Sequence, residues 1–154
     1  MRFSRRIQSP VGVLTLFSDG TFVVALCFGE HAEEDISCPV LEQAVCELGE
    51  YFAGSRQVFT VALRGEGTEF QRTVWDALRG IPYGETRTYA DLARKIGHAG
   101  ACRAVGNAIH RNPLPIFLPC HRVMGKNGTL TGYAGGLERK SFLLDLEKRW
   151  HRGS

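Results

Sequence analysis

The sequence predicts an α/β protein of the α+β type, with an N-terminal antiparallel sheet and helix followed by a mostly helical C-terminal domain. Two observations predict this class. β-rich runs separated by a turn signal fill the N-terminal end, whereas apolar residues recur at helical spacing in the second half. A length of 154 residues suits one large or two small domains. We place the domains at 1–64 and 68–154, joined by a glycine-containing linker.

The N-terminal domain carries strand signals first and a helix signal second. Residues 3–28 predict a β-meander, because two β-rich runs flank an Asp-Gly hairpin signal at 19–20. Residues 39–52 predict a helix, since apolar residues recur at helical spacing and Pro39 suits a first turn. Residues 59–63 are a further strand candidate. No motif in this half indicates chemistry.

The C-terminal domain opens with helices. Thr68 and Gln71 form a capping-box pattern, which predicts a helix ending near Arg79. Residues 89–96 and 101–111 predict two short helices around a glycine-containing turn. This arrangement is typical of a helix-turn-helix, although any helical hairpin has the same pattern.

The end of the chain alternates turns with apolar segments. Prolines after the second short helix lead into 116–118, an apolar run that predicts a buried strand. Residues 126–128 form a turn signal and 133–136 a glycine-rich loop. Residues 137–150 predict the last helix, whose candidate core residues are Phe142, Leu143, Leu146 and Trp150.

The central chemical motif is Cys120 followed by His121, directly after Pro119. A cysteine acts as a nucleophile in its thiolate form, and a nearby imidazole is a common base for making one. Neighbours on a chain rarely face each other, so a bridging water is the easier route for the proton. The alternative is a cysteine that serves only as a small buried hydrophobe.

Charge is unevenly distributed between the halves. Residues 1–67 hold five arginines against nine acidic residues, a balance of −4, whereas residues 68–154 hold fourteen basic against seven acidic residues, a balance of +7. A basic half that carries the reactive cysteine suits an anionic partner such as nucleic acid. A solvated basic surface without a partner is the alternative.

The sequence has five cysteines, which is an odd number, and none of them forms a Cys-x-x-Cys pair. We therefore predict no disulfide framework. Cys27, His31 and Cys38 could in principle converge on a zinc ion, although their local spacing does not favour a zinc site. No long apolar run predicts a membrane span or a signal core. We therefore expect a cytoplasmic protein, or a nuclear one if the source is a eukaryote.

The C-terminal half resembles the methylated-DNA–protein-cysteine methyltransferases, also called 6-O-alkylguanine-DNA alkyltransferases. The order and spacing of several segments agree with that family, whereas the N-terminal half resembles it only loosely. The matching segments are Ile81-Pro82-Tyr83-Gly84, Arg103-Ala104-Val105-Gly106, Asn112-Pro113, Pro119-Cys120-His121-Arg122-Val123, Gly132-Tyr133-Ala134-Gly135-Gly136 and Leu143-Leu144-Asp145-Leu146-Glu147.

The resemblance implies direct reversal of DNA damage. An alkyl group, preferably methyl, would pass from the 6-oxygen of guanine to Cys120, irreversibly and once per molecule, with 4-O-methylthymine as a second substrate. In that family the cysteine proton passes through water and a histidine to a glutamate, which implies these roles for His121 and Glu147. Tyr89 would donate a proton to the leaving guanine. The resemblance implies no metal and no organic cofactor.

The resemblance also implies how DNA is held. Arg103 would enter the base stack, Ala104 and Gly106 would lie against the minor groove, and Tyr89 would help rotate the nucleotide out of the duplex. The pocket and its supports would be formed by Asn112, Pro115, Val123, Tyr133, Ala134 and Lys140. Ala134 replaces a serine of some members and leaves the range of alkyl groups open.

The expected partner is double-stranded DNA containing alkylated guanine, bound by a monomer that could cluster on DNA. Two other functions fit parts of the pattern. A DNA-binding protein without chemistry, such as a lesion sensor or a regulator, would keep its activity without Cys120. A cysteine hydrolase using Cys120 and His121 would turn over many substrate molecules.

Overall fold

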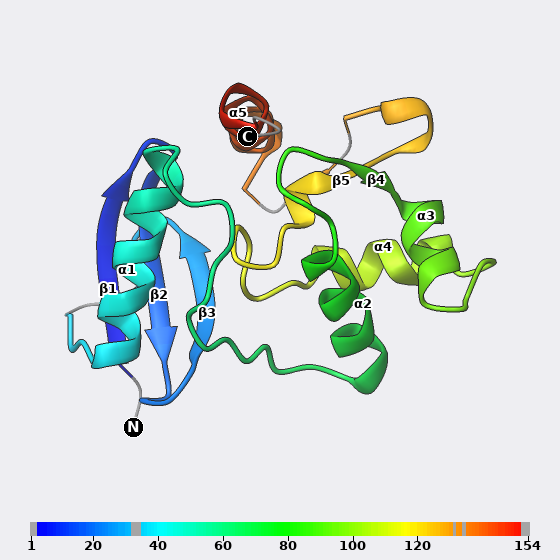
Figure 1. The fold of residues 1–154 in the computed structure, drawn as a ribbon. Coiled ribbons are helices and arrows are strands. Elements are labelled where there is room, and N and C mark those ends of the chain that lie inside the picture. Colours follow the sequence, from blue (N-terminus) through cyan, green and yellow to red (C-terminus); the bar gives the residue numbers. More distant parts are fainter. Residues whose placement is uncertain (1–2, 32–34, 131, 134, 152–154) are drawn as a thin grey trace. The chain divides into compact units, whose positions relative to one another are not determined.

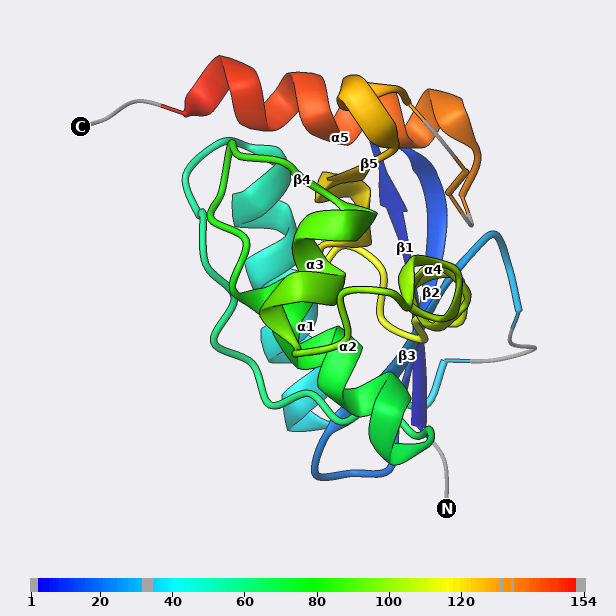
Figure 2. The ribbon, with the colours of Figure 1, turned by 90° about the vertical axis from the view of Figure 1, so that its right-hand side faces the viewer.

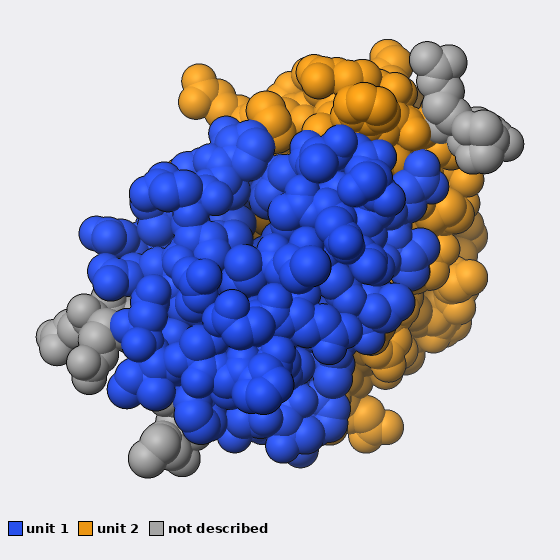
Figure 3. All heavy atoms as spheres, turned by 60° about the vertical axis from the view of Figure 1, so that its left-hand side comes forward, with its two compact units in different colours: residues 1–66 blue, residues 67–154 orange. Residues whose placement is uncertain are grey.

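The computed structural model describes residues 3–31, 35–130, 132–133 and 135–151. The chain divides into two compact units, 1–66 (unit 1) and 67–154 (unit 2), which Figure 3 shows in different colours. That each unit acts as a separate domain, with unit 1 as a support, stays a prediction.

Unit 1 is an antiparallel sheet with one helix packed on it (Figure 1). Strands β1 (Phe3–Ser9), β2 (Gly12–Ser18) and β3 (Val23–Phe28) pair in chain order, and helix α1 (Pro39–Phe52) follows. Apolar residues of β2 and α1 meet in a core that excludes solvent, including Leu14, Leu16, Leu41 and Leu48. The predicted meander and helix are confirmed.

The strand predicted over residues 59–63 is wrong. Only Leu63 forms an isolated bridge, with Val23. The backbone N–H groups of Thr60 and Val61 donate instead to the buried Glu47 carboxylate, at 2.9 and 3.1 Å. Because this side chain takes donors that a strand would give to its neighbour, the segment runs as an irregular connection.

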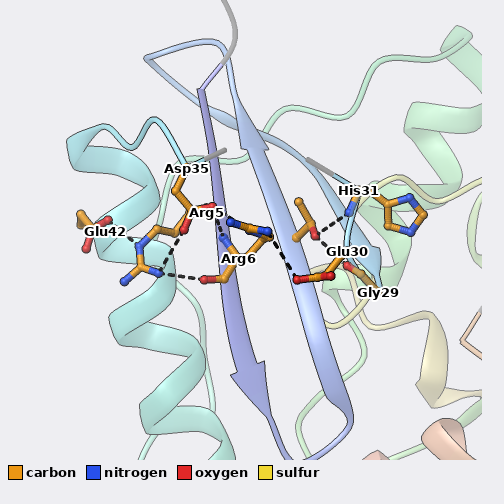
Figure 4. A network of polar contacts seen from close by, with 8 residues as sticks. Arg5, Arg6, Gly29, Glu30, His31, Asp35 and Glu42 are labelled. Carbon is orange, nitrogen blue, oxygen red and sulfur yellow. Dashed lines mark hydrogen bonds and ion pairs between the residues drawn. The ribbon is translucent and has the colours of Figure 1, made fainter. Parts of the chain in front are cut away.

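The two arginines of β1 take part in a network of polar contacts (Figure 4). The Arg5 Nε donates to Glu42 at 3.1 Å and the Arg6 Nε donates to Asp35 at 3.2 Å. These side chains are partly exposed, and exposed ion pairs contribute only about 0–1 kcal/mol each. The network orders these surface side chains but contributes little to the free energy of folding of unit 1.

Unit 2 is mostly helical, and its helices α2, α3 and α4 pack together (Figure 2). Its elements are α2 (Glu69–Arg79), β4 (Arg87–Thr88), α3 (Tyr89–Lys95), α4 (Cys102–His110), the 3-10 turn η1 (Cys120–Arg122), β5 (Val123–Met124), the 3-10 turn η2 (Lys126–Gly128) and α5 (Leu137–Trp150). The predicted capping box at Thr68 is present, and Thr88 caps α3 in the same way. The Trp75 indole donates to the Ala108 carbonyl at 2.8 Å and so ties α2 to α4.

The strand predicted over residues 116–118 is also wrong. Ile116 has a φ of 77°, and Leu118 bridges only back to Pro115. A β-branched residue in the left-handed region is strained by about 1–3 kcal/mol, so surrounding contacts must hold it there. The segment is a tight turn, and Cys120 therefore opens a 3-10 turn instead of ending a strand.

The core face of α5 differs from the prediction. Leu143 and Leu146 are buried as expected, but Phe142 and Trp150 are 37% and 42% exposed. Lys140 and Glu147 occupy the inward face instead. Charged side chains are buried only where partners compensate them, so both residues must find partners inside unit 2. Within the part of the chain that the structure describes, no helix is long and apolar enough to cross a membrane.

Candidate active site

A short parallel pairing links the segment before Tyr89 to the segment after Cys120. The η1 turn that begins with Cys120 runs directly into β5, and β4 runs directly into α3, which Tyr89 opens. Strands β4 and β5 pair in parallel, with Arg87 opposite Val123. The backbone therefore fixes the start of α3 beside the end of β5, the strand that follows the cysteine turn.

A buried carboxylate on α5 orients the histidine. The Glu147 Oε2 atom lies 2.6 Å from His121 Nε2, and both side chains are at most 1% exposed. His121 Nδ1 makes no hydrogen bond to any described residue. With Nε2–H donating to the carboxylate, Nδ1 is the ring nitrogen that can accept a proton.

Arg122 holds the same carboxylate from the other side. Its Nε and Nη2 atoms donate to Oε1 and Oε2 of Glu147 at 2.8 and 2.9 Å, and its Nη1 atom donates to the Ile81 carbonyl at 2.7 Å. The backbone N–H of Gly84 adds a fourth donor at 3.2 Å. Such a bidentate pair fixes the direction as well as the charge of the carboxylate.

These contacts set the protonation states of the pair. Burial alone would raise the pKa of Glu147, but His121 and Arg122 outweigh burial and hold that pKa well below its usual range. Burial lowers the pKa of His121, which Glu147 only partly opposes. At neutral pH the pair is therefore an ionised glutamate and a neutral imidazole, the form in which histidine can act as a base.

The Cys120 thiol is poised but protonated. Burial raises its pKa to about 11, while Asn112 and Lys140 favour the thiolate. The fully buried Lys140 donates from Nζ to the Val123 carbonyl at 2.6 Å. A thiol in this environment needs a base before it can react, and His121 is the adjacent candidate.

Asn112 shapes the turn that leads to the cysteine. Its Nδ2 atom donates to the Leu118 carbonyl and its Oδ1 atom accepts from the Leu114 N–H, both at 2.9 Å. The side chain thus bridges the two ends of the turn that includes Pro115 and the strained Ile116. This bridge is the contact that holds the left-handed backbone in place.

The exposed face of α4 carries the predicted DNA-binding residues. Arg103 and Ala104 are exposed, and Arg103 makes no hydrogen bond or ion pair with the described residues. A Cβ added at Gly106 would lie 3.8 Å from the ring of Tyr89, an ordinary van der Waals distance, so the first side chain of α3 packs against α4 at this point. The structure therefore brings Tyr89 and Gly106 together and leaves Arg103 projecting from the helix.

Arg122 and Gly84 both lie in the matching segments, but neither was predicted to contact Glu147. The signal for Arg122 was its position next to His121, but only the fold shows that both reach one carboxylate. Tyr133 is buried, while Ala134 lies outside the described residues. Among the described residues, no group of three or more His, Cys, Asp or Glu side chains is arranged to hold a metal ion.

Comparisons with known proteins agree with this geometry. Residues 4–64 match the family model described as 6-O-methylguanine DNA methyltransferase, ribonuclease-like domain, and residues 69–149 match the DNA binding domain of the same family. A methylated-DNA–protein-cysteine methyltransferase of Mycolicibacterium paratuberculosis is 47% identical over 151 residues, which cover 94% of this chain and 92% of that protein.

Solved structures give the same result. The crystal structure of the Mycobacterium tuberculosis O6-methylguanine methyltransferase is 45% identical, with a TM-score of 0.90 over 100% of this chain and 97% of that chain. A structure of the same organism's protein in complex with DNA has a TM-score of 0.89 at 45% identity, over 97% and 95% of the two chains. With both halves of the sequence matched by its models, the chain belongs to the 6-O-methylguanine DNA methyltransferase family.

Proposed function

We propose that this protein repairs DNA by moving the alkyl group of 6-O-alkylguanine irreversibly to Cys120. The observation that carries the proposal is the buried sequence of groups Cys120, His121 and Glu147, in which each side chain can play one part. Family membership supports the same reaction, since the relatives are named for it. Methyl is the preferred group, and 4-O-methylthymine is the second substrate.

The transfer is a displacement at carbon. His121 Nδ1 takes the thiol proton through a water molecule, and Glu147 stabilises the imidazolium that forms. The Cys120 sulfur then bonds to the alkyl carbon as the carbon–oxygen bond breaks. The electron pair of the broken carbon–oxygen bond stays on guanine, which accepts a proton from Tyr89. His121 holds the proton that left the thiol, so the proton lost by Tyr89 is matched by the one that His121 has gained. The thioether has no partner that would hydrolyse it, so the protein reacts once.

The base must leave the duplex to reach a buried sulfur. Unstacking a nucleotide costs a few kcal/mol, which contacts to DNA must offset. We assign this work to α4, where the exposed Arg103 would fill the vacated stack and Ala104 and Gly106 would lie against the minor groove. Pro115, Val123, Tyr133, Ala134 and Lys140 form the alkyl pocket in this proposal, with Asn112 as its support.

The proposed partner is double-stranded DNA, which the protein binds as a monomer. The excess of positive charge in unit 2 supports this partner, because neutralised phosphates release counterions. Clustering on DNA and a cytoplasmic or nuclear location stay predictions.

Mass analysis tests the proposal directly. The protein is mixed with duplex DNA containing 6-O-methylguanine, and its intact and peptide masses are measured. A gain of one methyl group on the peptide that holds Cys120, saturating at one per molecule, is expected. Tight binding with an unchanged mass would instead identify a lesion sensor. Product that accumulates beyond one per molecule would identify a hydrolase.

A further inference from the structure

The turn that follows α2 contacts the Arg122–Glu147 ion pair at neighbouring positions. The Ile81 carbonyl accepts from Nη1 of Arg122 at 2.7 Å, and the Gly84 N–H donates to Oε1 of Glu147 at 3.2 Å. Between these two backbone contacts lies Tyr83, which is 6% exposed. The Cζ atom of Arg122 lies over the Tyr83 ring, 5.6 Å from its centroid. A cation this close to an aromatic face is attracted by it, most strongly where water is excluded.

The turn is held in place by α5 and the residue that follows it. Gly84 has a φ of 80°, a left-handed conformation that favours glycine. A Cβ added there would lie 2.6 Å from the Nδ1 atom of His151, so the His151 ring lies directly against the Gly84 backbone. Glu147 and His151 therefore contact the turn at two points. The position of the Tyr83 ring is tied to these contacts, because Tyr83 precedes Gly84 in the same turn.

A buried tyrosine of unit 1 shows how a core tyrosine packs without a charged neighbour over its ring. Tyr51 on α1 is fully buried, and its ring centroid lies 5.4 and 5.3 Å from those of two phenylalanines. The Tyr83 ring has a guanidinium over it, and that guanidinium donates to both oxygens of Glu147. Burial and the Glu147 charge raise the pKa of the Tyr83 phenol, whereas Arg122 lowers it. The phenol is therefore neutral at neutral pH and does not replace the carboxylate as the partner of Arg122.

We propose that Tyr83 is a positioning residue for alkyl transfer, whose ring holds the Arg122 guanidinium in the direction that orients Glu147 and, through it, His121. This inference rests on the proposed function. The ring lies against the guanidinium carbon, while the N–H groups of Arg122 donate to Glu147 and Ile81. When the ring is lost, the guanidinium can tilt, and the carboxylate then orients the base less well.

The test separates the aromatic face of Tyr83 from its hydroxyl and its bulk. Tyr83→Phe keeps the face, whereas Tyr83→Leu keeps only an apolar side chain. Single-turnover transfer from duplex DNA containing 6-O-methylguanine is measured on the folded fraction at increasing DNA concentration. Tyr83→Leu is expected to lower the rate at saturating DNA about tenfold, which corresponds to ~1.4 kcal/mol. The DNA concentration that gives half of this rate should change less than about twofold, and Tyr83→Phe should match the unaltered protein within about twofold.

Two further variants show whether the ring acts through the guanidinium. Arg122→Met removes the cation, so adding Tyr83→Leu to this variant should slow transfer by less than about twofold, as expected when one contact couples the two sites. Tyr51→Leu removes a buried ring of unit 1 and is the matched control. It should destabilise the fold and leave the transfer rate of the folded fraction within about twofold.

The outcomes separate this inference from the function it rests on. Absent methyl transfer by the unaltered protein would overturn the proposed function itself. Normal transfer by that protein, with an unchanged saturating rate in Tyr83→Leu, would overturn only the role of Tyr83. So would a tenfold loss that Tyr83→Phe shares or that persists in the Arg122→Met background, because neither depends on a ring that faces the guanidinium.

A further variant decides if Tyr83→Leu or Arg122→Met does not fold. A ring-fluorinated phenylalanine at position 83 nearly keeps the size of the ring, but fluorine withdraws the electron density that attracts a cation. This variant should transfer more slowly than Tyr83→Phe, and equal rates for the two would contradict the proposal.

Discussion

Among the described residues, each unit contains one buried glutamate, and the two differ in what holds them. Glu47 on α1 is 3% exposed and accepts from the N–H groups of Thr60 and Val61, the Thr60 hydroxyl and the Gln43 amide. Glu147 on α5 is 1% exposed and accepts from an imidazole and a guanidinium. In both cases burial raises the pKa, but the hydrogen-bond partners outweigh it and leave the pKa lowered.

The comparison shows that burial and a lowered pKa do not by themselves mark a functional carboxylate. Glu47 contacts mainly neutral donors that cannot change their charge, so it serves to pin a connection to a helix. Glu147 contacts a ring that can gain a proton and lies next to a nucleophile. The chemistry of the partners separates a structural acid from one that can take part in a reaction.

The largest effect is expected when the nucleophile, Cys120, is removed from the site that contains Glu147. Cys120→Ser should abolish alkyl transfer while leaving DNA binding within about twofold, because the hydroxyl is far less nucleophilic than a thiolate. Cys46→Ser, at an exposed cysteine of unit 1, is the matched control and should transfer normally. Peptide mass after reaction measures both. Residual methylation of the serine variant on another cysteine would contradict the assignment.

Exchanging the two glutamates for glutamine sharpens the comparison itself. Glu147→Gln should slow transfer by about 10²-fold or more, since a base loses the group that orients it. It should also destabilise the fold by about 3–5 kcal/mol, because Arg122 is left buried without its partner.

Glu47→Gln should cost about 1.5–3 kcal/mol of stability with a transfer rate within about twofold of the unaltered protein. Denaturant unfolding and single-turnover rates, measured on the folded fraction, provide both readouts. Similar losses of rate in the two variants would mean that the glutamates differ only in position.

Replacing one arginine in each unit should change the transfer rate by a smaller amount. Arg103→Ala should slow repair in duplex DNA about tenfold and leave reaction with the free alkylated base nearly unchanged, because only the duplex requires unstacking. Arg5→Ala removes an exposed ion pair of unit 1 and should affect neither assay. Equal losses in duplex and free base would contradict the base-flipping role of Arg103.

The same contrast explains what the sequence could and could not predict. Caps, the hairpin and the helices follow from neighbours in the chain, so Thr68 with Gln71 was readable directly. The two wrong strand predictions failed because of distant or strained contacts. Glu47 accepts from the N–H groups of Thr60 and Val61, and Ile116 has a left-handed backbone conformation.

The site shows the same limit. The motif resemblance names Cys120, His121 and Glu147, but the convergence of Arg122 and Gly84 on one carboxylate spans 25 and 63 residues of chain. The residue types can be predicted from a pattern, whereas the convergence of these groups on the Glu147 carboxylate is set by the fold.

The pH dependence of transfer is the mildest and most specific test of the pair. His121 must be neutral to accept a proton, and burial lowers its pKa below 6.5. The rate should therefore change less than about threefold between pH 8 and pH 6.5 and fall at lower pH. Glu147→Gln removes a charge that raises this pKa, so its acid limb should move to still lower pH, whereas Glu47→Gln should leave it in place. A free thiol without a base would behave differently: the rate would climb about tenfold per pH unit toward its pKa, which is about 11. Single-turnover rates across this range distinguish the two, and such a climb would show that His121 is not the base.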